Sequence, residues 1–203
     1  MKHIITVQHP QSQHHVNGMV GSWTDWSLTQ EGRKQAQAIA RHVKEMVPTD
    51  CSLAIYSSDL KRTQEVAEMI GEAVDVVPTY LQSLRERNLG KCCGKSVQWL
   101  KENIEKEEFT IDDRLFSDAE SRRDVWERLL PTYETILQTD KEWIILVSHG
   151  DLLAVWNAIF LGLPVDFLNK ADLFGYAGGI SYMYIDKKGK HLIKQISDLS
   201  HLK

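Results

Sequence analysis

The sequence predicts an α/β fold, a three-layer α/β/α sandwich whose central sheet is mostly parallel. Short β-branched apolar runs alternate along the chain with longer stretches whose apolar residues recur at helical spacing. Two of the apolar runs end directly in a histidine, at Val7-Gln8-His9 and Val147-Ser148-His149. Because parallel strands present their carboxyl ends at one edge of a sheet, we expect both imidazoles to stand at that edge.

The predicted strands are short and apolar, as is typical of strands buried on both faces. They cover residues 4–7, 51–56, 74–77, 143–147, 180–185 and 192–196. The last two should form a hairpin around Lys188-Gly189, and Pro78 should close the third.

The predicted helices cover residues 29–47, 59–73, 97–108, 119–138 and 150–161. Thr29 is the expected N-cap of the first, because its hydroxyl can accept a hydrogen bond from the first turn. The helix over 97–108 is highly charged and should be exposed, and Pro131 should kink or interrupt the helix over 119–138. Since neither a repeat nor a linker divides the chain, we expect one domain over residues 1–203.

Composition excludes several classes of partner. The chain has 203 residues and a net charge of −4 with no basic run, which argues against nucleic acid as a partner. The odd cysteine count, with Cys51, Cys92 and Cys93, indicates a reduced protein, and this spacing does not match a zinc site. Without a leader-like start or a stretch long enough to span a membrane, the expected location is cytoplasmic.

The two strand-end histidines suit phosphoryl transfer. Such a reaction without metal needs a nucleophile, a positive cradle for the phosphate and a proton donor for the leaving oxygen. A neutral imidazole can attack phosphorus, so His9 and His149 could supply nucleophile and cradle. A single strand-end histidine is more often structural, but two in matching positions favour a functional role.

Four blocks, in order, carry a resemblance to the histidine phosphatase (phosphoglycerate-mutase-like) superfamily. The first is the run 6–12, Thr-Val-Gln-His-Pro-Gln-Ser, with Gly-Ser-Trp-Thr-Asp at 21–25 and Leu-Thr-Gln-Glu-Gly at 28–32. The second is 57–67, which contains Arg62; the third is 84–90, which contains Glu86; the fourth is Val-Ser-His-Gly at 147–150. The order and spacing of these blocks extend over essentially the whole chain.

The resemblance implies a phosphoglycerate-mutase-like fold and a two-step reaction through a phosphohistidine at His9, without cofactor or metal. It implies that Arg62 and His149 hold the phosphoryl oxygens, and that Glu86 protonates the leaving alkoxide and then deprotonates water. The further residues expected to bind substrate or phosphate are Gln8, Ser12, His15, Gly21, Ser22 and Arg87. Taken alone, Glu86 would more often be a solvated carboxylate beside an arginine.

The first block departs from the family pattern, which has arginine before the nucleophile and glycine after it. Gln8 carries no charge and cannot form the two-pronged arginine contact, a loss worth about 1.5–3 kcal/mol. Pro10 favours an extended His9, which suits a strand end. His14 and His15 could compensate if protonated; the alternative is an exposed pair of loop residues.

The preferred function is therefore that of a phosphomonoester hydrolase acting on small phosphorylated metabolites. A hydrolase is favoured over a mutase because the chain is short and residues 86–97 leave little room for an insertion over the substrate. The alternative is a degenerate family member that binds phospholigands or partners with little turnover. A metal hydrolase is poorly supported, because the sequence contains neither His-x-His nor His-Glu-x-x-His spacing. A homodimer is compatible with the sequence.

Overall fold

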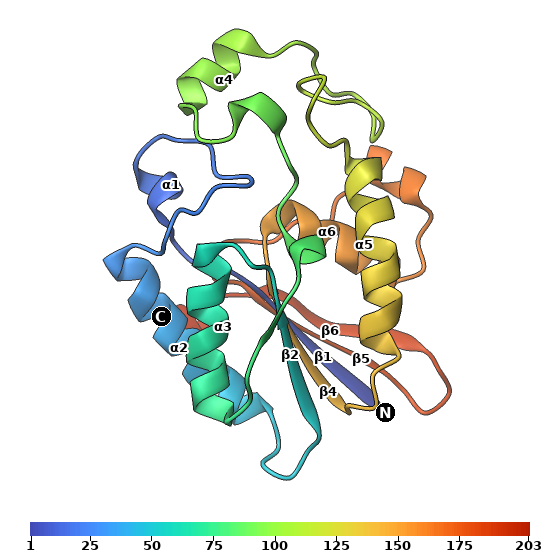
Figure 1. Cartoon of the computed structure of the whole chain (residues 1–203). Coiled ribbons are helices and arrows are strands. Elements are labelled where there is room, and N and C mark those ends of the chain that lie inside the picture. The colour runs from blue at the N-terminus through green and yellow to red at the C-terminus, as the bar shows by residue number, and fades with distance from the viewer.

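A six-stranded sheet forms the centre of the computed structural model, which describes residues 1–203 (Figure 1). The strand order is β3-β2-β4-β1-β5-β6. The strands are β1 (Lys2–Gln8), β2 (Leu53–Ser57), β3 (Thr79–Tyr80), β4 (Trp143–Ser148), β5 (Ile180–Ile185) and β6 (His191–Asp198). β3, β2, β4 and β1 run parallel, whereas β5 and β6 add an antiparallel hairpin next to β1.

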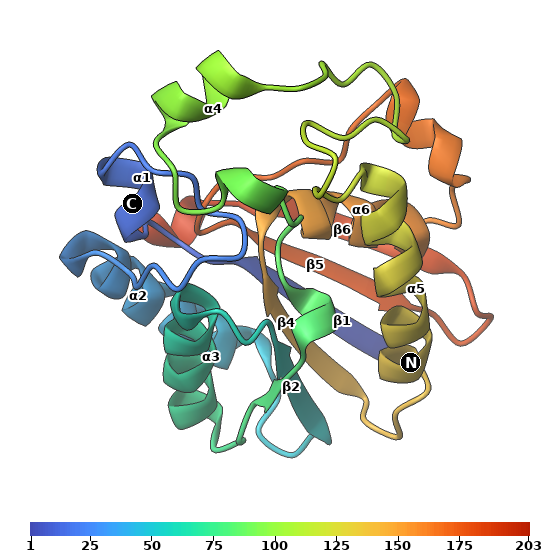
Figure 2. The same ribbon diagram turned by 45° about the horizontal axis from the view of Figure 1, so that its top comes forward.

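Helices cover both faces of the sheet. The α-helices are α1 (Gln13–Val16), α2 (Gln30–Met46), α3 (Lys61–Val74), α4 (Val97–Asn103), α5 (Arg122–Leu137) and α6 (Gly150–Phe160). Short 3₁₀ helices are η1 (Gln82–Leu84), η2 (Gly90–Cys92), η3 (Val165–Asn169) and η4 (Ser200–Leu202). α2 and α3 cover one face and α5 and α6 the other, while α1 and α4 lie beyond the carboxyl ends of the parallel strands (Figures 1 and 2).

Strand alternation divides the apolar core into two layers. Ile5 and Val7 of β1 pack into the layer under α2 and α3, whereas Ile4 packs into the layer under α5 and α6. Neighbouring side chains of a strand point to opposite faces, so a run of consecutive apolar residues supplies both layers. The predicted three-layer α/β class with a mostly parallel sheet is confirmed.

Most predicted elements are present at nearly their predicted positions. Thr29 is the N-cap of α2, and its Oγ1 accepts a hydrogen bond from the Gly32 amide at 2.9 Å. The predicted C-terminal hairpin is formed by β5 and β6, and Gly189 in its turn has φ +77°, a conformation that favours glycine. None of the helices is both long and apolar enough to cross a lipid bilayer.

The predicted strand over 74–77 is wrong. Helix α3 continues through Val74 and ends at Asp75, whose φ of +56° gives a left-handed C-cap, and the Val76 amide bonds back to the Gly71 carbonyl. Val77 is 88% exposed, so its β-branched side chain does not belong to a buried strand. The strand at this edge is Thr79–Tyr80, which begins only after Pro78.

Two helix predictions also need correction. The predicted helix over 97–108 ends at Asn103, because the charged residues that follow offer no apolar stripe to pack and instead form a loop. Ion pairs such as Lys91–Glu105 and Lys106–Asp113 hold that loop. In α5, the helix runs on through Pro131, so the expected interruption is wrong, whereas a kink at Pro131 stays a prediction.

Candidate active site

The ends of two adjacent parallel strands bring His9 and His149 together. Gln8 of β1 lies opposite Ser148 of β4, and the His9 amide donates to the Ser148 carbonyl at 3.1 Å. The two imidazole centroids are 5.1 Å apart with a near-perpendicular arrangement. His9 is 4% exposed and His149 is fully buried, so both rings lie beneath the surface.

Hydrogen bonds fix the tautomer of His9. Its Nδ1 lies 2.9 Å from the Pro10 carbonyl oxygen, which can only accept, so Nδ1 carries the hydrogen. Nε2 then holds a lone pair, and Arg62 Nε donates to it at 3.1 Å. Burial, and then the charge of Arg62, lower the pKa of His9 well below 6.5. His9 is therefore neutral at pH 7, with Nε2 in the form that can attack an electrophile.

Arg62 links His9 to the loop that follows β1. It lies in the first turn of α3 and is 1% exposed, with Nη1 donating to the Thr24 carbonyl at 2.7 Å and Nη2 to the Ser22 carbonyl at 2.8 Å. Burial lowers the pKa of Arg62 to about 10, so the guanidinium stays charged at neutral pH. Ser22 has φ +47°, an uncommon conformation for a residue with a side chain.

His149 is held from the side opposite His9. Its Nε2 lies 2.8 Å from Ser58 Oγ, while its Nδ1 is buried and has no hydrogen-bond partner. Burial, followed by the charge of Arg62, lowers the pKa of His149 well below 6.5. An unpaired buried nitrogen is uncommon in native proteins, and here it belongs to a ring beside the His9 imidazole.

Glu86 is a carboxyl group whose pKa is shifted towards neutrality. Its Oε1 accepts hydrogen bonds from the Arg87 amide at 2.9 Å and from the Leu152 amide, in the first turn of α6, at 3.3 Å. Burial, and then the negative charge of Asp151, raise the pKa of Glu86 to about 7. A carboxyl with this pKa can both donate and accept a proton near neutral pH.

Glu86, His9 and Arg62 line one polar cavity of about 220 Å³. The other lining residues are Gln8, His14, His15, Val20, Gly21, Ser22, Arg87, Leu89, Gly150, Asp151 and Phe174. The structure thus brings together every predicted site residue except two. His149 lies behind His9, and Ser12 is buried with its Oγ 2.7 Å from His14 Nδ1, where it supports that ring.

The pKa values of His14 and His15 argue against the first alternative, compensation by protonation, and of the second, an exposed pair, only His15 is exposed. Burial lowers the pKa of His14 to about 3, and burial and Arg62 lower that of His15. His15 Nδ1 accepts from the Ser12 amide at 3.1 Å, so its Nε2 carries the hydrogen. His15 therefore offers a neutral N–H donor.

The same imidazoles form a poor metal site. Nitrogens of His9, His14 and His15 lie within 4.8 Å of one another. The Arg62 guanidinium, however, donates to His9 Nε2, and His15 Nδ1 already accepts a backbone hydrogen. A cation at this position would face a fixed positive charge, so the donor set does not favour a metal ion.

Gln8 and Phe174 both line the polar cavity, on the side where Gly150 lies. A Cβ on Gly150 would lie 2.8 Å from the Phe174 ring and 3.2 Å from Gln8 Nε2, so the three residues are in close packing. Phe174 is 56% exposed. A longer side chain such as arginine at position 8 would have to share this cavity with the Phe174 ring.

The wall beyond Glu86 is a network of paired charges. Arg87 donates to Glu108 at 2.9 Å and its Nε lies 3.3 Å from an Asp151 oxygen. Arg122 contacts Asp172 at 2.7 Å and Asp151 at 3.3 Å. Arg87 and Asp151 border both the polar cavity and a neighbouring cavity of about 240 Å³, which leaves space for the remainder of a ligand.

Several supporting residues were not assigned a role from sequence. Arg128 binds Glu120 at 2.7 Å and donates to the carbonyls of Ser83 and Glu86, so this pair holds the segment that carries Glu86. A weak signal was present, because residues 119–121 resemble the family's Gly-Glu-Ser helix start. Asp151 follows the last motif directly, whereas no local pattern singles out Phe174.

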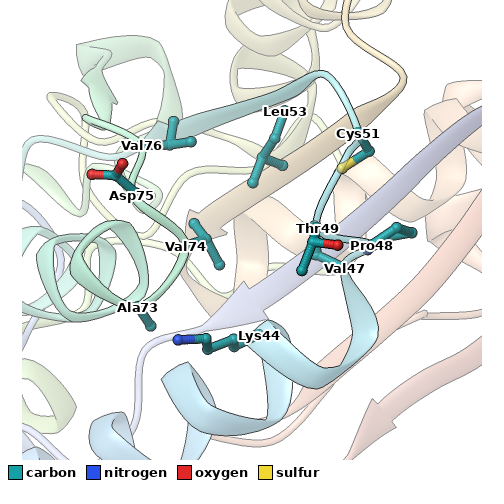
Figure 3. Close-up of a pocket in the computed structure, with 10 residues that line it drawn as sticks. All are labelled: Lys44, Val47, Pro48, Thr49, Cys51, Leu53, Ala73, Val74, Asp75 and Val76. Atoms are coloured by element: carbon teal, nitrogen blue, oxygen red, sulfur yellow. The ribbon is translucent and has the colours of Figure 1, made fainter.

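A separate hollow of about 260 Å³ lies at the amino end of β2 and contains none of the predicted site residues (Figure 3). It is formed where α2 and α3 end, and its lining is mainly apolar, including Val47, Leu53, Val74 and Val76. Cys51, a free cysteine, also borders it. Its composition does not suggest phosphate chemistry.

Comparison with known proteins agrees with this geometry. The family model of the histidine phosphatase superfamily (branch 1) matches residues 4–197. A glucosyl-3-phosphoglycerate phosphatase of Mycolicibacterium vanbaalenii is 29% identical, over 82% of this chain and 77% of the relative. A probable phosphoglycerate mutase of Escherichia coli is 30% identical, over 81% of this chain and 77% of the relative.

Solved structures share the fold over almost the whole chain. The Bacillus stearothermophilus protein YhfR superposes with a TM-score of 0.85 at 22% identity, covering 100% of both chains. A mycobacterial glucosyl-3-phosphoglycerate phosphatase superposes with a TM-score of 0.81 at 22% identity, covering 97% of this chain and 98% of that one. With a family match over residues 4–197, the chain belongs to the histidine phosphatase superfamily.

Proposed function

We propose that the protein is a phosphomonoester hydrolase acting on small phosphorylated metabolites through a phosphohistidine at His9. The observation that carries the proposal is the unprotonated Nε2 of His9 beside the Arg62 guanidinium, in one cavity with the Glu86 carboxyl. Membership of the histidine phosphatase superfamily and the phosphatases among its relatives support the same reaction class.

In the first step, Arg62 Nε transfers its hydrogen bond from His9 Nε2 to a phosphoryl oxygen, the freed Nε2 lone pair attacks phosphorus, and the bond between phosphorus and the ester oxygen breaks. Glu86, protonated in a substantial fraction of molecules because its pKa is about 7, gives its proton to the departing alkoxide. Arg62 offsets the charge that develops on the phosphoryl oxygens. In the second step, Glu86 takes a proton from water, the water oxygen attacks phosphorus, and the N–P bond breaks to release inorganic phosphate.

Neutral donors take part of the role that the family gives to the arginine replaced by Gln8. The unpaired Nδ1 of His149 would gain a partner if it carried a hydrogen and bonded a phosphoryl oxygen. The Nε2 hydrogen of His15 is a second such donor. Because neither group is charged, we expect phosphate affinity below that of a site with two arginines.

The network of ion pairs beyond Glu86 favours a substrate with a neutral leaving group, such as a sugar or polyol. A leaving group that carries a carboxylate near the ester is disfavoured. Arg87 and Arg122 are both occupied by carboxylates of the protein, so binding a substrate carboxylate there would require breaking those contacts. The relatives named as glucosyl-3-phosphoglycerate phosphatases would differ from this protein in that respect, because a glycerate carries a carboxylate close to its phosphate ester. A panel of sugar, polyol and carboxylate phosphates tests this ranking.

Hydrolysis of p-nitrophenyl phosphate by wild type and His9→Ala tests the proposal. The matched control is His3→Ala, which removes an imidazole from the opposite end of the same strand. We expect His9→Ala to abolish turnover and His3→Ala to preserve it. Protein quenched at alkaline pH during turnover should carry one added phosphoryl group on the peptide that contains His9. Equal rates for wild type and His9→Ala would refute the proposal.

The alternative is a protein that binds phosphorylated ligands with little turnover, and Gln8 is the observation that favours it. That alternative predicts a wild-type protein that binds phosphate or vanadate but hydrolyses nothing in the panel. It also predicts that an arginine introduced at position 8 restores hydrolysis.

A further inference from the structure

A second cluster of metal-ligating side chains lies outside the candidate active site. It contains His42 of α2, Asp198 at the end of β6 and His201 of η4, and one potential ligand atom of each lies within 4.8 Å of the others. We propose that these three residues bind one divalent transition-metal ion of the zinc type. This inference does not depend on the proposed phosphatase function.

The hydrogen bonding of His201 leaves one nitrogen ready to ligate. Its Nε2 lies 3.1 Å from the Gly178 carbonyl oxygen, which can only accept, so Nε2 carries the hydrogen and Nδ1 holds a lone pair. Nδ1 is buried and has no hydrogen-bond partner. Metal-ligating histidines commonly donate their other ring N–H to a carbonyl in this way. The unpaired Nδ1 is therefore accounted for if it binds a metal ion.

The other two ligands complete a donor set suited to zinc. The His42 ring lies almost parallel to that of His201, with centroids 5.4 Å apart. Asp198 forms no ion pair with a lysine or arginine, so its carboxylate has no fixed counter-charge. Two imidazoles and a carboxylate are ligands that zinc takes, with a fourth position left to solvent. Glu45, with Oε2 3.9 Å from His42 Nδ1, supplies a further carboxylate at the site.

The position of the cluster gives the ion a role in holding the chain together. The C-terminal end of the chain lies beside α2, and the ion would join the two (Figure 1). Behind His201, the Gly178 amide bonds to the carbonyls of Gln8 and His9 at 3.1 and 3.2 Å. A metal ion here would therefore stabilise the C-terminal turn and the backbone behind the strand end that carries His9.

Calorimetric titration of Zn²⁺ into the metal-free full-length protein tests the proposal. All measurements use a His14→Ala background, which removes one donor of the active-site imidazole cluster. We expect one Zn²⁺ per chain, with a Kd raised at least about tenfold by His201→Ala, by His42→Ala and by Asp198→Asn. His191→Ala is the matched control, because its Nδ1 also lies near a carbonyl oxygen, that of Phe160, but outside either cluster.

Thermal melting provides an independent readout. Zn²⁺ at a hundred times its Kd should raise the Tm of the parent protein, which carries only His14→Ala, by roughly 5–10 °C. The Tm of the same protein with His42→Ala added should stay nearly unchanged. Because His42 lies on a helix surface, this variant should fold even if His201→Ala does not. The proposal is overturned if the parent binds no Zn²⁺, or if Zn²⁺ binding survives all three substitutions.

Discussion

The two ends of the central sheet bury different kinds of residue. At the carboxyl ends of β1 and β4, the polar side chains of His9, Arg62 and His149 are almost fully buried and contact one another or nearby polar groups. At the amino end of β2, the hollow is lined mainly by apolar side chains such as Leu53 and Val74 (Figure 3). One sheet thus separates a polar cavity from an apolar one.

The contrast indicates which end serves chemistry and which serves stability. Burying polar and charged groups costs free energy even when they are hydrogen-bonded, whereas burying apolar area is favourable. The carboxyl end also holds a left-handed Ser22 and an unpaired His149 Nδ1. We therefore expect substitutions of the buried polar groups at the carboxyl end to lower activity without lowering stability, and substitutions at the amino end to lower stability without lowering activity.

The largest effect is expected from His9→Ala. Removing the proposed nucleophile should lower kcat/KM at least about a thousandfold, since no neighbouring group replaces the covalent step. Its melting temperature should stay within a few degrees of wild type, because the imidazole contributes polar contacts rather than apolar core. Steady-state kinetics and thermal melting on the same preparations measure both quantities. A large loss of Tm with activity retained would mean that His9 serves stability rather than chemistry, the reverse of what we expect at the carboxyl end of the sheet.

Glu86→Gln should come next, lowering kcat roughly a hundredfold or more on alkyl phosphates. The effect should be smaller on p-nitrophenyl phosphate, whose leaving group needs little protonation. In wild type, kcat/KM for an alkyl phosphate should fall as pH rises through about 7, because Glu86 must be protonated to act as the acid. Equal sensitivity of both substrate types to the substitution would argue against Glu86 as the proton donor.

Glu86→Gln should also raise the stability of the fold at neutral and higher pH. The folded-state pKa of Glu86 is raised from 4.5 to about 7, so the folded protein binds more protons than the unfolded chain over that interval. Stability from this group is therefore lost as pH rises from 4.5 to 7. As the pH rises from 4 to 8, the free energy of unfolding of Glu86→Gln should increase by up to about 3 kcal/mol relative to that of wild type. Urea unfolding at several pH values measures this difference.

The two strand-end histidines were predictable because a local apolar run and a simple topological rule place them. The parallel pairing of β1 with β4 then sets their separation. Arg62 and Glu86 were assigned only through the resemblance, since by themselves they are ordinary charged residues. Burial and the Asp151 charge, which shift the pKa of Glu86, arise from tertiary structure and leave no local pattern.

The predictions about secondary structure that were wrong have a related cause. Three of the four residues 74–77 are β-branched and apolar, yet the helix before them extends to Val74, which is half-buried against the core below α3. The loop after Asn103 is held by ion pairs between side chains 14 and 7 residues apart, spacings at which no helical or strand periodicity predicts an ion pair. Phe174, which limits the space around Gln8, lies far along the chain from every motif.

An arginine at position 8 should have a smaller effect, and its sign should depend on Phe174. Gln8→Arg alone should leave kcat/KM within a few-fold of wild type, because the Phe174 ring occupies the space beside Gln8. Combined with Phe174→Ala, the arginine should raise kcat/KM about tenfold, as expected for one added charge-assisted contact to phosphate. Phe174→Ala alone is the control. A full gain in Gln8→Arg without the second change would show that the ring is no obstacle.

The smallest effect on activity is expected at the amino end of the sheet. Leu53→Ala removes apolar contact beside the hollow and should lower the free energy of unfolding by about 1–2 kcal/mol, less than for a fully buried leucine because Leu53 is half-buried. Its kcat/KM should stay within twofold of wild type, because the substitution lies at the far end of the sheet from His9. Urea unfolding and p-nitrophenyl phosphate kinetics on one preparation separate the two quantities. A tenfold loss of kcat/KM with unchanged stability would mean that the two ends of the sheet are coupled, and the division between a chemical end and a stabilising end would then fail.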